Sequence, residues 1–200
     1  MTASADFLKD PLSLFDIRGK VAVVTGASGA FGALAVQVLA GAGAKVAAVA
    51  GNAEALAETA STARALCAEV LTIKARPTDE GACEDIVAET VKAFGGLDIL
   101  VVASGKNDVA KIVDMAPRRF LDVMDANVTQ SWLMARAAGK QMLAQGRGGK
   151  IVLMSSARGK LGHPAGYSAY CASKSAIDGI TRALGCEWGN TGITVNAIAP

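Results

Sequence analysis

The stretch VAVVTGASGAFGALAVQ, residues 21–37, changes character twice along its length. It begins with the β-branched and small apolar residues of a buried strand, breaks at TGASGAFG (25–32), and resumes with helical spacing. A glycine turn between a strand and a helix lets a ligand approach the backbone, and the first amides of that helix suit a pyrophosphate. Tight packing of a strand onto a helix also requires small residues. The loop by itself therefore leaves a purely structural interpretation open.

The composition indicates one folded unit. A chain of 200 residues that is 52% hydrophobic can bury one sizeable core but not several. We expect an amino-terminal arm at residues 1–18 and a single domain over residues 19–200. Lys and Arg together number 20 against 18 for Asp and Glu, without a concentrated basic run. The charge pattern therefore argues against nucleic acid or an anionic membrane as a partner.

Targeting and metal-binding signals are missing from the sequence. The start of the chain has no basic segment followed by an apolar one, and no apolar run reaches the roughly 18 to 20 residues of a membrane helix. We therefore expect a soluble, cytoplasmic protein. The four cysteines form no CxxC pair, and His163 is the only histidine, so we expect buried free thiols and no metal site. The cysteines are Cys67, Cys83, Cys171 and Cys186.

Short apolar segments alternate with amphipathic ones along the whole chain. This alternation predicts an α/β fold, a doubly wound parallel sheet with helices on both sides and strands buried on both faces. Ligands of such sheets bind along the edge formed by the carboxyl ends of the strands. The predicted strands are residues 20–25, 45–50, 69–75, 97–104, 149–156 and 192–199. The predicted helices are residues 30–42, 53–67, 79–94, 117–145 and 168–189.

Tyr170 and Lys174 form the most specific chemical motif of the sequence. Their spacing of four places the ammonium one helical turn from the phenol, on the same face. An unperturbed phenol titrates near pH ~10, so it exchanges protons poorly at neutral pH unless a nearby cation stabilises the phenolate. Lys174 is placed to do this. The hydroxyls of Ser155 and Ser156 lie at the carboxyl end of a predicted strand and are located to hydrogen-bond a carbonyl oxygen as its charge develops.

Together these motifs resemble the short-chain dehydrogenase/reductase family, from about Phe15 to Pro200. The glycine loop is similar to the family's TGxxxGxG pattern, with Ala30 at the middle glycine, and Tyr170 and Lys174 match its YxxxK pattern. The resemblance implies a Rossmann fold and hydride transfer between NAD(P) and a carbonyl or secondary alcohol. The cofactor-binding residues that it implies are Gly26, Ser28, Ala30, Phe31, Gly32, Ala103, Ser104, Gly105, Tyr170 and Lys174.

The resemblance also implies four catalytic roles. Tyr170 acts as the general acid in reduction and the base in oxidation, supported by Lys174, which also binds the nicotinamide ribose. Ser156 holds the substrate oxygen, and Asn127, in DANVTQSW (125–132), anchors a water in a proton relay with Lys174. A serine after a strand, an asparagine in a helix and a packed tyrosine are each commonplace. Their joint occurrence in the family's order favours catalysis over coincidence.

The sequence departs from the family pattern at two places that bear on the cofactor. Residues 102–105 read VASG where the family usually has NNAG, so two side-chain amides are lost. Residues 49–52 read VAGN, without the acidic residue that would hold the ribose hydroxyls of NAD. Both NAD and NADP remain open, with a slight lean to NADP. Arg76 either offers a charge near the adenine or is a solvated loop residue.

The substrate is the least determined part of the prediction. The resemblance implies a small polar alcohol or carbonyl compound, similar in type to the sugars, polyols or gluconates of this family. Polar residues of two loops either face such a substrate or are merely solvated. These residues are Lys106, Asn107, Arg158, Lys160 and His163.

Three expectations concern the whole protein. Family members continue past a strand similar to NAIAP (196–200) into a last strand and a substrate lid, so we expect the given chain to lack both. The resemblance also implies a homodimer or homotetramer, paired through the helices that carry Asn127 and Tyr170. A non-catalytic dinucleotide-binding or sensor protein on the same fold is the alternative function, and a scaffold without cofactor is a third.

Overall fold

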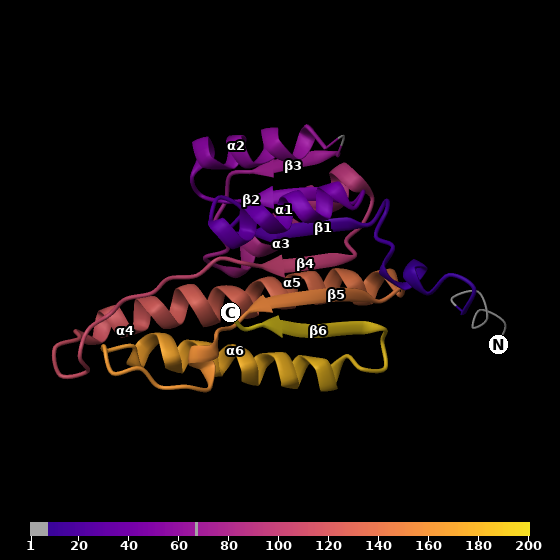
Figure 1. Cartoon of the computed structure of the whole chain (residues 1–200). Coiled ribbons are helices and arrows are strands. Elements are labelled where there is room, and N and C mark those ends of the chain that lie inside the picture. The colour runs from indigo at the N-terminus through magenta and orange to yellow at the C-terminus, as the bar shows by residue number, and fades with distance from the viewer. Residues whose placement is uncertain (1–7, 67) are drawn as a thin grey trace.

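Six parallel strands form one sheet in the order β3-β2-β1-β4-β5-β6. The computed structural model describes residues 8–66 and 68–200, and Figure 1 shows the strands side by side with their arrowheads at one edge. The order reverses beside β1, because the chain runs outward from β1 to β3 and then returns to β4 on the other side of β1. Open sheets bind ligands at such a reversal. The strands are β1 (Val21–Thr25), β2 (Lys45–Val49), β3 (Val70–Ile73), β4 (Ile99–Val102), β5 (Gly149–Met154) and β6 (Ile193–Ile198).

Helices cover both faces of this sheet and complete three layers. α1 (Ala30–Gly41) and α2 (Ala53–Arg64) pack on one face, and α3 (Glu80–Phe94), α5 (Gln130–Gln145) and α6 (Ser168–Glu187) pack on the other. The arrangement confirms the predicted doubly wound α/β fold. The other elements that the described residues form are α4 (Pro117–Met124), the π-helical segment η3 (Asp125–Thr129), and the short 3₁₀ helices η2 (Pro11–Phe15) and η4 (Ala157–Gly159).

Successive residues of the central strands point to opposite faces of the sheet. Ala22 and Val24 of β1 belong to the apolar cluster under α1 and α2, whereas Val23 belongs to the cluster under α3 and α5. The expected burial on both faces holds for β1 and β4, whose residues are all buried. It is wrong for β6, where buried and exposed residues alternate. β6 is an edge strand, and in the described part of the chain α6 covers only one of its faces.

Two predicted segments differ in detail from the structure. The helix predicted over 117–145 is a continuous helical run, but a π-helical segment at 125–129 interrupts its α-helical hydrogen bonding. The short 3₁₀ helix η2 occupies part of the predicted arm, and residues 1–7 of that arm lie outside the described residues. Within residues 8–66 and 68–200, no helix is long and apolar enough to cross a membrane.

The cysteines are less uniformly buried than expected. Cys83 is buried, Cys171 is half-buried and Cys186 is exposed, and each is a free thiol. The expectation of burial is therefore wrong for Cys186, which lies near the carboxyl end of α6. Cys67 lies outside the described residues. The described residues contain no cluster of three or more His, Cys, Asp or Glu side chains that could hold a metal ion.

Candidate active site

The glycine loop between β1 and α1 lies directly on the segment that leaves β4. Gly26 has a φ of 68°, and a Cβ at this position would lie 2.5 Å from the backbone nitrogen of Ser104. A Cβ on Gly32 would overlap the carbonyl oxygen of Gly26. Both glycines are therefore required by close backbone contact. Gly29 is the N-cap of α1 and no side chain caps this helix, so its first amides are left available to an anion.

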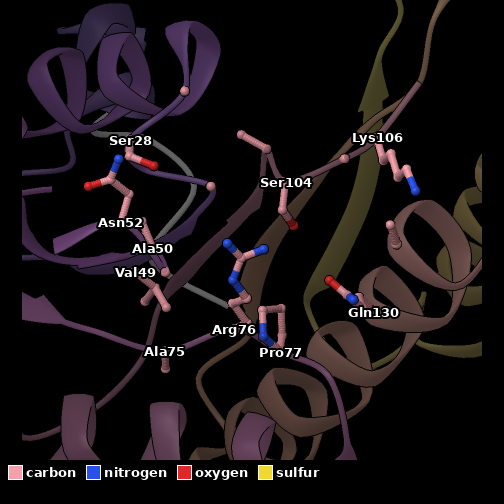
Figure 2. Close-up of a pocket in the computed structure, with 16 residues that line it drawn as sticks. Ser28, Val49, Ala50, Asn52, Ala75, Arg76, Pro77, Ser104, Lys106 and Gln130 are labelled. Atoms are coloured by element: carbon pink, nitrogen blue, oxygen red, sulfur yellow. The ribbon is translucent and has the colours of Figure 1, made fainter. Parts of the chain in front are cut away.

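A cavity of about 470 Å³ opens beside this loop, at the carboxyl ends of the strands (Figure 2). Its 16 lining residues include two basic side chains, Arg76 and Lys106, and no acidic one. A glycine-walled cavity with a helix amino terminus and a positive lining fits the phosphates of a dinucleotide. The lining residues are Gly26, Ser28, Gly29, Val49, Ala50, Gly51, Asn52, Ala75, Arg76, Pro77, Ala103, Ser104, Gly105, Lys106, Ala126 and Gln130.

A second cavity, of about 230 Å³, continues from the first and contains the predicted catalytic tyrosine. The two cavities share residues 103–106, which form a common wall. Of the predicted site residues, the second cavity adds Phe31, Ser156, Tyr170 and Lys174. The structure therefore places the predicted cofactor loop and the predicted catalytic pair at one edge of the sheet. Ala30, Gly32 and Asn127 line neither cavity.

Tyr170 and Lys174 lie side by side on α6, as their spacing predicts. The Lys174 Nζ lies 5.4 Å from the centre of the Tyr170 ring and donates a hydrogen bond of 2.7 Å to the carbonyl oxygen of Met154. Lys174 is 3% exposed, and this burial lowers its pKa to about 8. The Tyr170 hydroxyl makes no hydrogen bond within the described chain, so it is available to a substrate in the cavity.

The lowered pKa of Lys174 predicts a specific dependence of stability on pH. Below about pH 8 the amine is protonated in the folded and unfolded chains, and the folded chain bears the cost of a buried charge. Between about pH 8 and the ordinary value of 10.5, only the unfolded chain still holds the proton, so this contribution to stability rises with pH. Each unit by which folding lowers the pKa changes the free energy of unfolding by about 1.4 kcal/mol.

Urea unfolding at pH 7.5 and pH 10 measures this contribution against the variant Lys174→Met. We expect the wild type to gain stability relative to the variant as the pH is raised. Other groups also titrate in this range, and the comparison with Lys174→Met cancels their effect because both chains contain them. Parallel changes in the two proteins would contradict the prediction.

The two serines after β5 have different partners. The Ser155 hydroxyl is buried and donates a hydrogen bond of 2.6 Å to Asp178 on α6. It therefore links β5 to α6, and although Ser155 lines the cavity that contains Tyr170, its hydroxyl proton is already donated to Asp178. The Ser156 hydroxyl accepts a hydrogen bond of 3.3 Å from the Arg158 amide and lies 3.4 Å from the Pro200 carbonyl oxygen. Both contacts are long, and Ser156 lines the same cavity as Tyr170.

Asn127 lies in the π-helical segment and is 1% exposed. Its Oδ1 accepts a hydrogen bond of 2.6 Å from the Lys106 amide, and its Nδ2 donates to the Lys106 carbonyl oxygen at 2.8 Å. Nδ2 also donates to the Ser173 hydroxyl on α6 at 2.9 Å. The side chain thus connects the segment leaving β4 to the helix that carries the catalytic pair.

Sequence reasoning missed three residues that support the site. Ser173 and Asp178 join α6 to Asn127 and Ser155, and the Tyr167 ring packs edge-on against Tyr170 with 6.2 Å between the ring centres. The only signal in the sequence is their position on the helix, since Ser173 precedes Lys174 and Asp178 follows it by one turn. Polar residues at such positions are usually solvated, so that signal is weak.

Replacing Asn127 with alanine is expected to lower the free energy of unfolding by about 1 to 3 kcal/mol. The change would remove the partner of the partly buried amide and carbonyl of Lys106 and of the buried Ser173 hydroxyl, and this range is the usual cost of losing such hydrogen bonds. Urea unfolding checks the value. The control is Asn107→Ala, at an exposed neighbouring position, where we expect a change within about 0.5 kcal/mol. Equal effects at the two positions would contradict the role assigned to Asn127.

Known proteins match this chain over nearly all of its length. The family model described as short chain dehydrogenase matches residues 20–200. An uncharacterized oxidoreductase of Mycobacterium tuberculosis is 46% identical over 189 residues, covering 94% of this chain and 69% of that protein. A sorbitol dehydrogenase of Cereibacter sphaeroides is 36% identical over 185 residues, covering 92% of this chain and 70% of that protein.

A solved structure supports the same assignment. The crystal structure of a short-chain type dehydrogenase/reductase from Mycobacterium marinum superimposes with a TM-score of 0.92 at 34% sequence identity. The match covers 94% of this chain and 77% of that one. With the matched family model and the 46% identical relative, this likeness shows that the chain belongs to the short-chain dehydrogenase/reductase family of oxidoreductases.

Proposed function

We propose that the protein transfers a hydride between NAD(P) and the carbonyl or secondary alcohol carbon of a small polar substrate. The observation that carries the proposal is the pairing of Tyr170 and Lys174 in a cavity that continues from the glycine-walled one. A phenol with an unpaired hydroxyl beside a buried amine is the arrangement that general acid–base chemistry requires. The glycine-walled cavity is the place for the dinucleotide.

Each polar residue of the second cavity has its own role in the proposed reaction. When bound, the nicotinamide accepts the hydride in oxidation and supplies it in reduction. Tyr170 takes the hydroxyl proton of an alcohol substrate, or returns a proton to the carbonyl oxygen in the reverse direction. The ammonium of Lys174 stabilises the phenolate electrostatically, and Ser156 donates a hydrogen bond to the substrate oxygen.

Asn127 takes part in proton movement through its main chain. Its side-chain amide is committed to Lys106 and Ser173, whereas its main-chain oxygen accepts a hydrogen bond of 2.7 Å from the Ser131 hydroxyl. A carbonyl oxygen has a second lone pair, which can accept from a water. We assign to this oxygen the relay water that the family resemblance implies.

The substrate is a polyol or a sugar acid in this proposal. Lys106 and Asn107 line the cavity that contains Tyr170, so its entrance offers a cation and an amide to a polar or acidic substrate. The sorbitol dehydrogenase of Cereibacter sphaeroides, a polyol enzyme by its name, agrees with this class. The cofactor is NAD(P) with a slight preference for NADP, because the cavity lining contains no acidic residue to repel a further phosphate.

We also propose a homodimer or homotetramer in which α5 and α6 pair with a second copy. Trp132 and Leu143 of α5 are 46% and 44% exposed. They lie in a groove of about 440 Å³ that α5 and α6 form together with Trp188. The groove combines these apolar side chains with the charged Arg136, Lys140 and Glu187, and such a groove between two long helices suits the same helices of a partner.

Two measurements test the enzymatic proposal against its alternatives. Titration of NADPH and NADH, followed by their fluorescence, measures binding, and a panel of polyols and sugar acids followed by absorbance at the nicotinamide band measures turnover. Binding with turnover of at least one substrate is the expected result. Binding without any turnover would favour a dinucleotide sensor, and absence of binding would favour a scaffold.

A further inference from the structure

Residues that follow two neighbouring strands, β2 and β3, form a positively charged part of the larger cavity. Arg76 follows β3, and Figure 2 shows its guanidinium extending into the larger cavity between Asn52 and Ser104. Within the described residues this guanidinium makes no hydrogen bond and no ion pair. Arg76 thus brings an unpaired positive charge into a cavity whose lining has no carboxylate.

Gly51 provides the space that the guanidinium occupies. A Cβ at position 51 would overlap the Arg76 Nε and lie 3.0 Å from its Cζ. The guanidinium therefore lies against the backbone at Gly51, where any larger residue would displace it. Pro77, the next residue, is buried and restricts the backbone of Arg76 to extended conformations. The Arg76 side chain therefore extends into the cavity from a backbone of restricted conformation.

The segment after β2 contributes no carboxylate to the cavity that could form an ion pair with the Arg76 guanidinium. Asn52 replaces the acidic residue expected there, and its Oδ1 accepts hydrogen bonds from the amides of Glu54 and Ala55. Its oxygen is therefore committed to capping α2. The position lacks a carboxylate that would bind two ribose hydroxyls and repel a phosphate on one of them.

We propose that Arg76, held against Gly51, binds the phosphate on the adenosine ribose of NADP and makes the protein selective for NADP over NAD. The inference rests on the proposed function, because it assumes that a dinucleotide occupies the cavity. The positive charge is that of Arg76, which follows β3. Gly51, which follows β2, leaves the space that the guanidinium occupies. Gly51 is thus as much a determinant of cofactor choice as Arg76, although it makes no contact of its own with the phosphate.

Binding of reduced cofactors and of small nucleotides tests this inference without turnover. The probes are NADPH, NADH, 2′-AMP and 5′-AMP, measured by fluorescence or calorimetry on the whole chain. Arg76→Ala is expected to weaken NADPH and 2′-AMP binding about 10- to 100-fold, the usual worth of hydrogen bonds to a charged group. Binding of NADH and 5′-AMP should change by less than about threefold, since neither carries the ribose phosphate.

Two further variants distinguish a specific contact between Arg76 and the phosphate from a general effect of positive charge near the cavity. Gly51→Ala keeps Arg76 but displaces its guanidinium, so it is expected to weaken NADPH binding in the same direction as Arg76→Ala. Lys74→Ala removes an exposed cation from the same segment, outside the cavity, and should leave both cofactors unaffected. Thermal unfolding of each variant distinguishes a loss of contact from a loss of fold.

The possible failures are distinguishable. Equal losses of NADPH and NADH affinity in Arg76→Ala, or no loss of either, would overturn the inference and leave the oxidoreductase proposal intact. Selective NADPH binding that depends on Arg76, without turnover of any substrate, would overturn the enzymatic proposal alone. A wild-type chain that binds none of the four nucleotides would overturn both.

Discussion

Replacing Tyr170 with phenylalanine is expected to lower kcat by about 10²- to 10⁴-fold, the range of a lost general acid or base. The substitution removes one oxygen and keeps the ring, whose centre lies 5.4 Å from the Lys174 Nζ. Because no group of the described chain hydrogen-bonds to that oxygen, its removal leaves no protein partner unsatisfied. The loss should therefore appear in the chemical step rather than in stability or in cofactor affinity.

Steady-state kinetics on a substrate found in the panel measures the effect, and titration with NADPH and NADH confirms that binding is retained. Tyr167→Phe is the matched control, since the Tyr167 ring packs at a tilt on His163 and edge-on against Tyr170 and lines a different cavity. We expect its kcat to change by less than a few-fold. A Tyr170→Phe enzyme within threefold of the wild type would remove the basis of the proposed mechanism.

Replacing Gly32 with alanine is expected to destabilise the protein by about 3 kcal/mol, near the upper end for overpacking. Gly32 is buried in the first turn of α1, and a Cβ there would overlap the Gly26 carbonyl oxygen and approach the Ala27 Cα at 3.0 Å. Both obstacles are backbone atoms, so the helix must move away from the loop. We expect this shift to lower the affinity for NADPH and NADH alike.

Gly41→Ala provides the comparison on the same helix. A Cβ at Gly41 would meet the Leu66 side chain at 3.6 Å, an ordinary contact, so we expect a neutral or slightly stabilising change. Urea unfolding and dinucleotide titration of the two variants give both measurements. Similar stabilities for Gly32→Ala and Gly41→Ala would show that the loop and helix do not depend on the close contact.

Most of the fold could be predicted from the sequence because its signals are local. Runs such as residues 21–25 and 99–102 combine β-branched residues with burial, and a glycine or a capping residue marks most helix boundaries. The one-sided exposure of β6 does have a local signal, since apolar Ile193 and Val195 alternate with polar Thr194 and Asn196, and the prediction of burial on both faces overlooked it. The π-helical segment at 125–129 was also missed, since its register depends on tertiary contacts of Asn127.

The candidate site also combines features that the sequence predicts with features that depend on contacts between distant elements. The spacing of Tyr170 and Lys174 predicts their proximity, because a single helix fixes it. Adjacent Ser155 and Ser156 are equivalent in sequence, and only the position of Asp178 on another element distinguishes them. The contact between Gly51 and Arg76 joins two strands and has no local signature, so the sequence could identify the arginine but not the space it uses.

The position of β1 between β2 and β4 has a consequence for synthesis of the protein. Val23 pairs with Ala47 early in the chain but with Leu100 much later, so a nascent chain that has formed β1, β2 and β3 still has one bare edge on β1. Unpaired strand edges promote association between chains, and such distant pairings form slowly. Until β4 leaves the ribosome, the glycine loop also lacks the backbone of residues 103–104 beneath it. Chaperones that shield this edge during translation would therefore raise the yield of native protein.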